Sequence, residues 1–314
     1  MQMPLGIKAY LDFVFKKMFG SPENSIALIG LLNAILDLPR RITDVTILNP
    51  FSYQEFQTAK MVVLDVKAAD SGGRYFNIEM QIVAHASLLQ RLVYYASEMY
   101  TDQLSGGDQY DQLNSTISIC LLKGRLFADS DRPHHRFQMM DAESHRKLDR
   151  AIEVHTVELA KFPYDATTIS IAPPLAQWSW LILNAHHYSS DELKRLFPDL
   201  AFQNAIRCLE SISSVTEDKA MHDQREKAER DHNWMLASAR QQGLEQGLEQ
   251  GIEQGLEQGL EQGIKQGTVA GAIQALQQVL GDPVSSTQDL SHQSVSELQT
   301  QLAELQTRIR SRLK

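Results

Sequence analysis

Glycine occupies every fourth position between residues 243 and 267, in the run GLEQGLEQGIEQGLEQGLEQGIKQG. An α-helix turns by about 400° over four residues, so the glycines drift by about 40° per repeat and cannot line one straight seam. Each interior glycine also costs a helix about 1 kcal/mol relative to alanine. The repeat therefore predicts a helix of marginal stability. Glu or Lys together with Gln in every unit excludes a membrane-spanning helix.

Two interpretations of this repeat stay open. It is either a spacer that acts as a weak oligomerisation element, or the core of a right-handed helical assembly, which a hydrophobic period above about 3.6 favours. The motif Gly281-Asp282-Pro283 interrupts the pattern, and residues 295–313 then read as an amphipathic helix. We expect a homo-oligomer formed through this tail. The predicted boundaries are a folded domain at 1–213, a charged helix at 214–242, the spacer at 243–267 and a C-terminal helical segment at 268–314.

The composition limits the class of protein. The chain has 314 residues, of which 43% are hydrophobic, and this is enough for one large domain with a sizeable core. Its two cysteines, Cys120 and Cys208, favour a reducing, cytoplasmic setting. No signal peptide is evident, and the longest apolar run, 26–36, is too short to cross a bilayer. The net charge of −9 weighs against nucleic-acid binding.

Hydrophobic periodicity over residues 1–213 predicts two helices, three strands, a helix, three strands and then further helices. That order is typical of an α/β core with a mixed sheet. The predicted helices are 5–19, 22–37 and 87–104, and the predicted strands are 41–48, 61–69, 75–83, 114–122, 137–140 and 152–160.

The strand YFNIEMQIV at 75–83 has one apolar face and carries Glu79 and Gln81 on the other. A three-residue turn at 71–73 would pair it with the preceding strand, so that Lys67 faces Asn77 and Asp65 faces Glu79. The Cβ atoms of the two acids would then lie about 5 Å apart.

Two carboxylates at this distance repel each other unless one is protonated or a cation lies between them. Mg²⁺ prefers oxygen ligands and keeps several waters, which suits a hairpin face open to solvent, and the Gln81 amide could orient a water or a phosphate oxygen. The alternative is an ordinary solvated face, on which Lys67 simply pairs with Asp65 or Glu79.

Asp65, thirteen further residues and then Glu79-Met80-Gln81 resemble the PD-(D/E)XK nuclease pattern. More specifically, the chain resembles the recombination-promoting nuclease/transposase family of bacteria, in which a glycine-rich helical tail is also common. The segments that carry this resemblance are LDFVFKKMFG (11–20), LLNAILDLP (31–39), ILNPF (47–51), LDVKAADSGGRYFNIEMQ (64–81), RLVYYASEMYTDQLSGGDQY (91–110) and ISICLL (117–122).

The resemblance implies a restriction-endonuclease-like α/β core, with a mixed central sheet flanked by helices, and metal-dependent cleavage of DNA phosphodiesters. Mg²⁺ is the expected cofactor, with Mn²⁺ or Ca²⁺ as alternatives. Gln81 stands where the wider superfamily has lysine, and glutamine supplies hydrogen bonds but no positive charge. The implied metal ligands are Asp65, Glu79, the Met80 carbonyl and Asp12, and the candidates for the missing positive charge are Lys67, Lys16 and Lys17. Lys16 and Lys17 are also candidate DNA contacts.

Arg91 is a candidate contact to the DNA backbone, where arginine forms strong charge-assisted bonds, or else a packing residue. We expect Tyr94, Tyr95 and Tyr100 to pack their helix on the sheet. The favoured function is a Mg²⁺-dependent DNA endonuclease linked to recombination or to mobile or foreign DNA. The alternatives are an inactive nuclease fold that binds DNA or regulates, and a scaffold that assembles through its tail.

Overall fold

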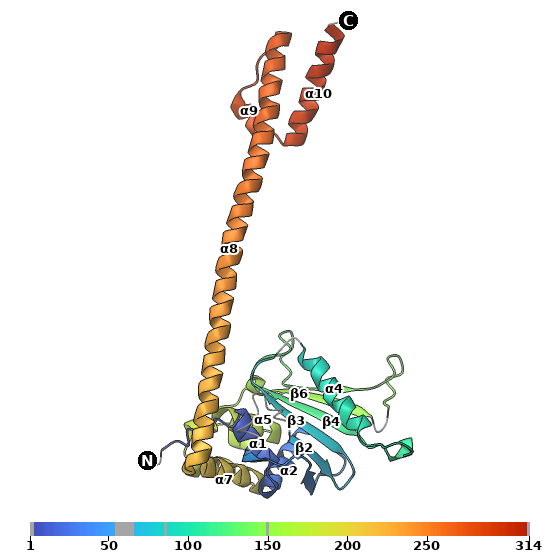
Figure 1. The fold of residues 1–314 in the computed structure, drawn as a ribbon, viewed down its shortest axis with the longest axis vertical. Coiled ribbons are helices and arrows are strands. Elements are labelled where there is room, and N and C mark those ends of the chain that lie inside the picture. Colours follow the sequence, from blue (N-terminus) through green and yellow to red (C-terminus); the bar gives the residue numbers. More distant parts are fainter. Residues whose placement is uncertain (1–2, 54–65, 85–86, 149–150, 313–314) are drawn as a thin grey trace. The chain divides into compact units, whose positions relative to one another are not determined.

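The computed structural model describes residues 3–53, 66–84, 87–148 and 151–312. The chain divides into two compact units, Met1–Arg230 and Asp231–Lys314. The first unit contains a six-stranded sheet and helices that cover it, and the second is helical (Figure 1).

The strands follow the order β1-β2-β3-β4-β6-β5 across the sheet. β3, β4 and β6 are parallel to one another, whereas the pairs β1–β2, β2–β3 and β5–β6 are antiparallel. This is the mixed sheet that the alternation of strands and helices predicts. The strands are β1 (Val45–Ile47), β2 (Val66–Asp70), β3 (Tyr75–Gln81), β4 (Thr116–Leu122), β5 (His134–Gln138) and β6 (Ile152–Glu158).

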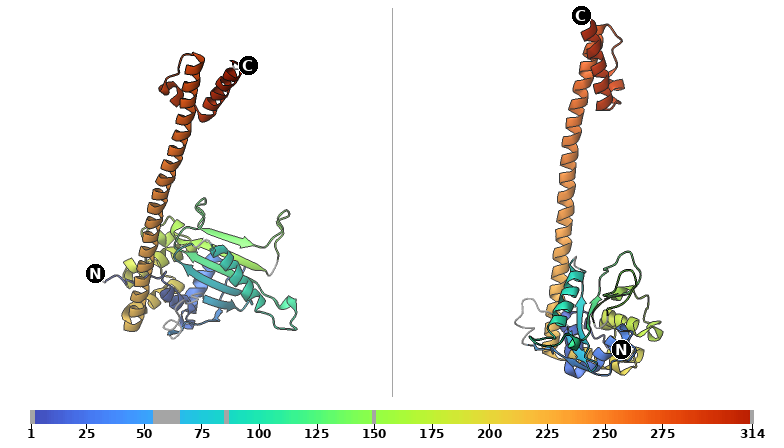
Figure 2. Two further views of the ribbon diagram at one scale, coloured as in Figure 1. Left: turned by 45° about the horizontal axis from the view of Figure 1, so that its top comes forward. Right: turned by 90° about the vertical axis from the view of Figure 1, so that its right-hand side faces the viewer.

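Helices cover both faces of the sheet. Figures 1 and 2 show α4 lying across one face, while α1, α2 and α5 lie on the other. α4 connects β3 to β4, and a parallel pair of strands requires such a crossover. The helices of this unit are α1 (Asp12–Gly20), α2 (Ser25–Ile35), α4 (Leu88–Thr101), α5 (Pro174–Asn184), α6 (Ser190–Leu196), α7 (Leu200–Ser214) and the start of α8 (Thr216–Leu280), and the short 3₁₀ helices are η1 (Pro22–Asn24), η2 (Tyr110–Gln112), η3 (Leu159–Lys161), η4 (Ile169–Ile171) and η5 (Ala185–His187).

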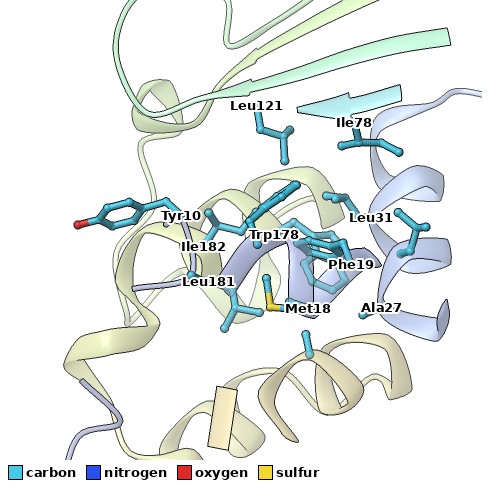
Figure 3. Packing of buried hydrophobic residues seen from close by; sticks show 14 of the residues in the cluster. Tyr10, Met18, Phe19, Ala27, Leu31, Ile78, Leu121, Trp178, Leu181 and Ile182 are labelled. Atoms are coloured by element: carbon cyan, nitrogen blue, oxygen red, sulfur yellow. The ribbon is translucent and has the colours of Figure 1, made fainter. Parts of the chain in front are cut away.

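The main core lies between the sheet and the layer that contains α1, α2, α5 and α7. Ile78 of β3 and Leu121 of β4 point from the sheet toward Trp178 and Phe19 (Figure 3). Phe19 and Trp178 pack edge-to-face with ring centroids 5.6 Å apart. Because side chains alternate along a strand, burying Ile78 in this core directs Glu79 to the opposite face, beneath α4.

The β2–β3 hairpin has the predicted register. Lys67 pairs with Asn77, and the Asp70 amide donates to the Arg74 carbonyl at 3.1 Å across the three-residue turn. Gly73 adopts a left-handed conformation in that turn, with φ of 81°. Asp65 lies outside the described residues, so its predicted position opposite Glu79 stays a prediction.

The first helix begins later than its hydrophobic pattern predicts. α1 starts at Asp12, not at residue 5, because the preceding segment bonds to another part of the chain. The amides of Leu5 and Gly6 donate to the carbonyls of Tyr188 and His186 at 2.9 and 3.2 Å, and Gly6 has φ of 66°.

In the second unit, the end of α8 packs against α9 (Thr287–Ser291) and α10 (Val295–Arg312). α8 ends at Leu280, and the left-handed Gly281 that follows confirms the predicted break. Within the described ranges, no helix combines the length and apolar character needed to cross a membrane. The buried core of this unit consists of Ile273, Leu280, Leu290, Leu298 and Leu305.

Candidate active site

Glu79 is a buried carboxylate in the middle of the sheet. Its exposed fraction is only 5%, so the interpretation of this face as an ordinary solvated surface is wrong. The expectation of a face open to solvent fails for the same reason, since α4 covers it. A buried carboxylate is costly unless hydrogen bonds and opposite charge compensate it.

Three side chains provide that compensation. The Asn77 amide nitrogen donates to Oε1 of Glu79 at 3.3 Å. The Gln81 amide nitrogen and Nη2 of Arg91 both donate to Oε2, each at 3.2 Å. Asn77 and Gln81 reach Glu79 because residues two apart on a strand share a face.

Arg91 reaches Glu79 from α4. The buried stripe of this helix includes Leu88 and Leu92, which pack with Cys120 of β4 under the helix. Residue 91 is three positions after Leu88 and lies beside that stripe, which directs its side chain toward the edge of the covered face. The sequence prediction left Arg91 open between contact with the DNA backbone and packing, and missed its ion pair with Glu79. DNA contact by Arg91 stays a prediction.

The face beneath α4 also carries unpaired polar atoms. Oδ1 of Asn77, Oγ of Ser118 and Oγ1 of Thr156 are buried and have no hydrogen-bond partner among the described residues. Asn77 pairs in register with Ser118, so two of these atoms lie on neighbouring strands. A bound water or ion would satisfy buried polar atoms of this kind.

The oxygen atoms of Glu79 and Asn77 are suitable ligands for a hard divalent cation. A carboxylate and an amide oxygen are the ligands that Mg²⁺ and Ca²⁺ prefer, and the orphan oxygen of Asn77 lies on the residue bonded to Glu79. Asn77 was not predicted as a site residue, although its position two residues before Glu79 on the same face was a usable signal.

Three further predicted site residues, Asp12, Lys16 and Lys17, have partners elsewhere in the chain. Asp12 begins α1, accepts the Phe13 amide at 2.6 Å and lies 3.6 Å from Arg225, and burial raises the pKa of its carboxyl. Lys16 is buried and donates to the Asn49 carbonyl at 2.7 Å, and Lys17 pairs with Asp218.

The remaining predicted residues lie on the hairpin itself. Lys67 is partly buried, and its amide donates to Oδ1 of Asn49 at 2.7 Å. Met80 packs its side chain against the main core, on the face opposite Glu79.

Contrary to the sequence prediction, the three tyrosines of α4 do not all pack this helix on the sheet. Tyr94 is 61% exposed, so the prediction that it packs the helix on the sheet is wrong. It follows Leu92 by two positions, and this spacing places it away from the buried stripe. Tyr95 and Tyr100 are partly buried.

The buried thiol beside Glu79 is not a reactive nucleophile. Cys120 pairs in register with Glu79 and is fully buried. Burial, with a smaller effect of the Glu79 carboxylate, raises the pKa of the Cys120 thiol far above its ordinary value. Since the thiolate is the reactive form, Cys120 has a structural function.

The neighbouring histidines of β5 and β6, His134 and His155, have protein partners. His134 bonds to His155 at 2.9 Å, and His155 bonds to Glu153 at 3.3 Å. In the described part of the chain, His222, Asp223 and Glu226 are the one group of three close potential ligands. However, Nε2 of His222 accepts the Lys8 amide at 3.1 Å and Glu226 pairs with the Lys8 ammonium, so their ligand atoms are engaged.

The partly buried His134 makes stability depend on pH. Burial lowers the pKa of His134 from 6.5 to about 4, with His155 contributing. A folded-state pKa below the unfolded one means that stability is complete above pH ~6.5 and declines as the pH falls toward ~4. We expect the urea midpoint to drop over this window. Replacing His134→Gln should flatten the dependence by about 1–2 kcal/mol, after allowance for solvent screening.

Urea denaturation at pH 7 and pH 4.5 measures this effect. His232→Gln is the control, because His232 is exposed and should leave the pH dependence unchanged. Equal pH dependence in the wild type and in His134→Gln would refute the prediction.

The mixed six-stranded sheet with parallel central strands and flanking helices is consistent with a nuclease-like α/β protein. The chain belongs to the PD-(D/E)XK nuclease family transposases, whose family model matches residues 9–239. PD-(D/E)XK nucleases generally use divalent metal ions. Searches of curated proteins and of solved structures gave no match.

Proposed function

We propose that this chain is a metal-dependent DNA endonuclease that hydrolyses phosphodiester bonds, in recombination or on mobile or foreign DNA. The observation that carries the proposal is the buried Glu79 carboxylate with Asn77, Gln81 and Arg91 converging on it. Family membership supports nuclease chemistry, and DNA is the substrate that the family implies.

Asp65 and Glu79 are the proposed metal ligands, together with the Met80 carbonyl and Asp12. The register in which Lys67 pairs with Asn77 is the one that the opposition of Asp65 and Glu79 requires, and this supports the assignment. Mg²⁺ at these ligands would polarise the phosphate and lower the pKa of a bound water.

The chain's own groups then orient the reactants. The Gln81 amide donates a hydrogen bond to the Glu79 carboxylate and can position a water or a phosphate oxygen. α4 excludes bulk water from this face, and fixed donors stabilise developing charge more strongly in such an environment.

The negative net charge, which weighs against DNA binding, is not distributed evenly along the chain. The repeat between 243 and 267 carries a glutamate in most units and one lysine, so part of the negative charge lies in the tail. The proposed catalytic residues all lie within 1–213, the proposed nuclease domain, in a protein that we place in the cytoplasm.

The deciding experiment is nicking of supercoiled plasmid by purified protein in Mg²⁺, Mn²⁺, Ca²⁺ or EDTA. We expect relaxed circles in Mg²⁺ or Mn²⁺ and none in EDTA. Equal cleavage in EDTA, or no cleavage in any metal, would refute the proposal.

One observation favours a second candidate, a catalytically inactive protein that binds DNA or regulates. Gln81 replaces the lysine of the wider superfamily and supplies no positive charge. This candidate predicts salt-dependent retention of DNA without cleavage in any metal.

We also propose that the tail forms a homo-oligomer. The repeat is helical within α8, and an added Cβ at any of its glycines meets no atom within 4 Å in this chain, so nothing described here requires glycine. A right-handed helical assembly, whose contact surface follows the drift of the glycines around the helix, would require it, because glycine lets backbones approach closely. The large apolar side chains exposed along the repeat are Leu244, Leu248, Ile252, Leu256, Leu260 and Ile264.

Replacing Gly251 and Gly255 by Ala tests this tail. In an isolated helix the pair should raise helix stability by about 2 kcal/mol. In a close-packed oligomer we expect it to shift the mass measured by light scattering toward the monomer. The matched control is Gln250→Ala with Gln254→Ala, which should leave the mass unchanged. A monomeric wild type would refute the proposal.

A further inference from the structure

Gln81 occupies the position at which the superfamily has lysine, so the site lacks the positive charge of that lysine. A lysine at position 81 would bring a positive charge to the end of β3, and glutamine brings an amide to the same place. That amide lies 3.2 Å from Oε2 of Glu79. Nη2 of Arg91 lies 3.2 Å from the same oxygen. The guanidinium and the Gln81 amide are therefore neighbours on one carboxylate oxygen.

Among the described residues, Arg91 is the cation that contacts Glu79. Lys16 and Lys17 are bound to Asn49 and Asp218. Lys123 follows β4, its amide donates to the Gln81 carbonyl at 2.9 Å, and its ammonium pairs with Glu229. Lys67 pairs in register with Asn77. The ion pair described for Glu79 itself is formed by Arg91 of α4.

Arg91 also has hydrogen-bonding capacity to spare. A guanidinium has five N–H donors. Nε of Arg91 is buried and meets no acceptor in the described part of the chain. The side chain as a whole is 37% exposed, whereas that of Glu79 is 6% exposed, so Arg91 connects the covered carboxylate to solvent.

We propose that Arg91 is a catalytic residue that supplies the positive charge missing at Gln81, by donating to a non-bridging oxygen of the scissile phosphate. This inference rests on the proposed nuclease function. In the reaction, the water oxygen bonds to phosphorus and the bond from phosphorus to the leaving sugar oxygen breaks. One water proton stays on the new phosphate, and the other passes through solvent to the leaving oxygen. Arg91 keeps its protons and stabilises the charge on the phosphate oxygens.

A purely structural Arg91 would behave differently. If it only neutralised Glu79, its removal would free that carboxylate for the metal and leave the rate at saturating metal intact. If it bound DNA only in the ground state, its removal would weaken DNA binding and leave kcat unchanged. A charge that acts in the transition state predicts a loss of kcat at saturating metal and DNA.

The test measures plasmid nicking by the full chain at saturating Mg²⁺ or Mn²⁺, with DNA retention in Ca²⁺ and thermal unfolding in parallel. We expect Arg91→Gln to lower kcat by about 10²–10³-fold while the affinity for the metal stays equal or rises. In the Arg91→Gln background, Gln81→Lys should restore kcat at least about tenfold, because it returns the charge from the strand. Arg74→Gln is the matched control, since Arg74 pairs with the buried Asp70 on the same hairpin and should keep the wild-type kcat.

An active wild type with an Arg91→Gln kcat within about threefold would overturn the assignment of Arg91 and leave the proposed function standing. A loss confined to DNA affinity would overturn it too, as would a failure of Gln81→Lys to restore kcat in a folded protein. A wild type inactive in every metal would overturn the inference together with the proposed function.

Discussion

Replacing Glu79→Gln is expected to reduce metal-dependent plasmid nicking by about 10³-fold or more, a loss of ~4 kcal/mol in transition-state stabilisation. The substitution keeps the shape of the side chain and its place beneath α4, but removes the negative charge that a divalent cation requires. It also leaves Arg91 without its anionic partner.

Glu153→Gln is the matched control for this prediction. Glu153 is likewise a carboxylate on a strand of the sheet that is paired with an arginine, since it binds Arg136 at 2.8 Å. It lies on β6, two strands from β3, and should keep wild-type nicking. Thermal unfolding of both variants identifies any loss that comes from the fold. Nicking by a folded Glu79→Gln within tenfold of the wild type would remove Glu79 from the site.

Asp65→Ala extends the same reasoning to the second proposed ligand. It should match Glu79→Gln in lost activity, because a hard cation held by two carboxylates loses most of its affinity when either one is removed. Retained cleavage by a folded Asp65→Ala would show that the second ligand lies elsewhere.

The hairpin could be predicted because its determinants are local. The sequence Ser71-Gly72-Gly73 indicates a tight turn, and the assumption of three residues in it fixed which residues pair across it. The apolar face of 75–83 specified which side enters the main core. Both inferences used residues within about fifteen positions of one another, and the pairing of Lys67 with Asn77 confirms them.

The burial of Glu79 could not be predicted in the same way. Its environment is set by α4, whose position depends on the crossover to β4 and on Leu88 and Leu92 packing over Cys120. A strand with polar residues on one face looks identical in sequence whether water or a helix covers that face. The partnership of Arg91 with Glu79 depends on the same tertiary packing.

The start of α1 shows a second limit. Its hydrophobic pattern extends back to Leu5, but the amides of Leu5 and Gly6 bond to the carbonyls of Tyr188 and His186, 183 and 180 positions further along the chain. Long-range backbone hydrogen bonds override a local helical pattern and leave no trace in it.

Replacing Lys161→Met is expected to destabilise the protein by about 3–5 kcal/mol, because it leaves a buried carboxylate without its partner. Lys161 of η3 lies 2.8 Å from Glu158 at the end of β6, and the two side chains are 3% and 0% exposed. The Lys161 ammonium also donates to the carbonyls of Phe127 and Ser130 at 2.7 and 2.5 Å, and Glu158 accepts the Leu126 amide at 2.8 Å. One ion pair thus anchors the segment that follows β4.

The expected loss corresponds to a fall in Tm of about 6–20 °C for a unit of this size, measured by calorimetry. Lys194→Met is the control, because Lys194 pairs with Glu210 at 2.9 Å with both side chains about a third exposed or more, and such pairs contribute less than about 1 kcal/mol. Adding Glu158→Gln to Lys161→Met should recover part of the loss, because the double variant no longer buries an unpaired charge. A fall in Tm no larger than that of Lys194→Met would contradict the prediction.

Below its unfolding transition, Lys161→Met should still nick plasmid within a few-fold of the wild type, since neither Lys161 nor Glu158 contacts Glu79 or Arg91 in the described structure. A stability defect without a catalytic one would separate the residues that hold this sheet together from those that we assign to its chemistry.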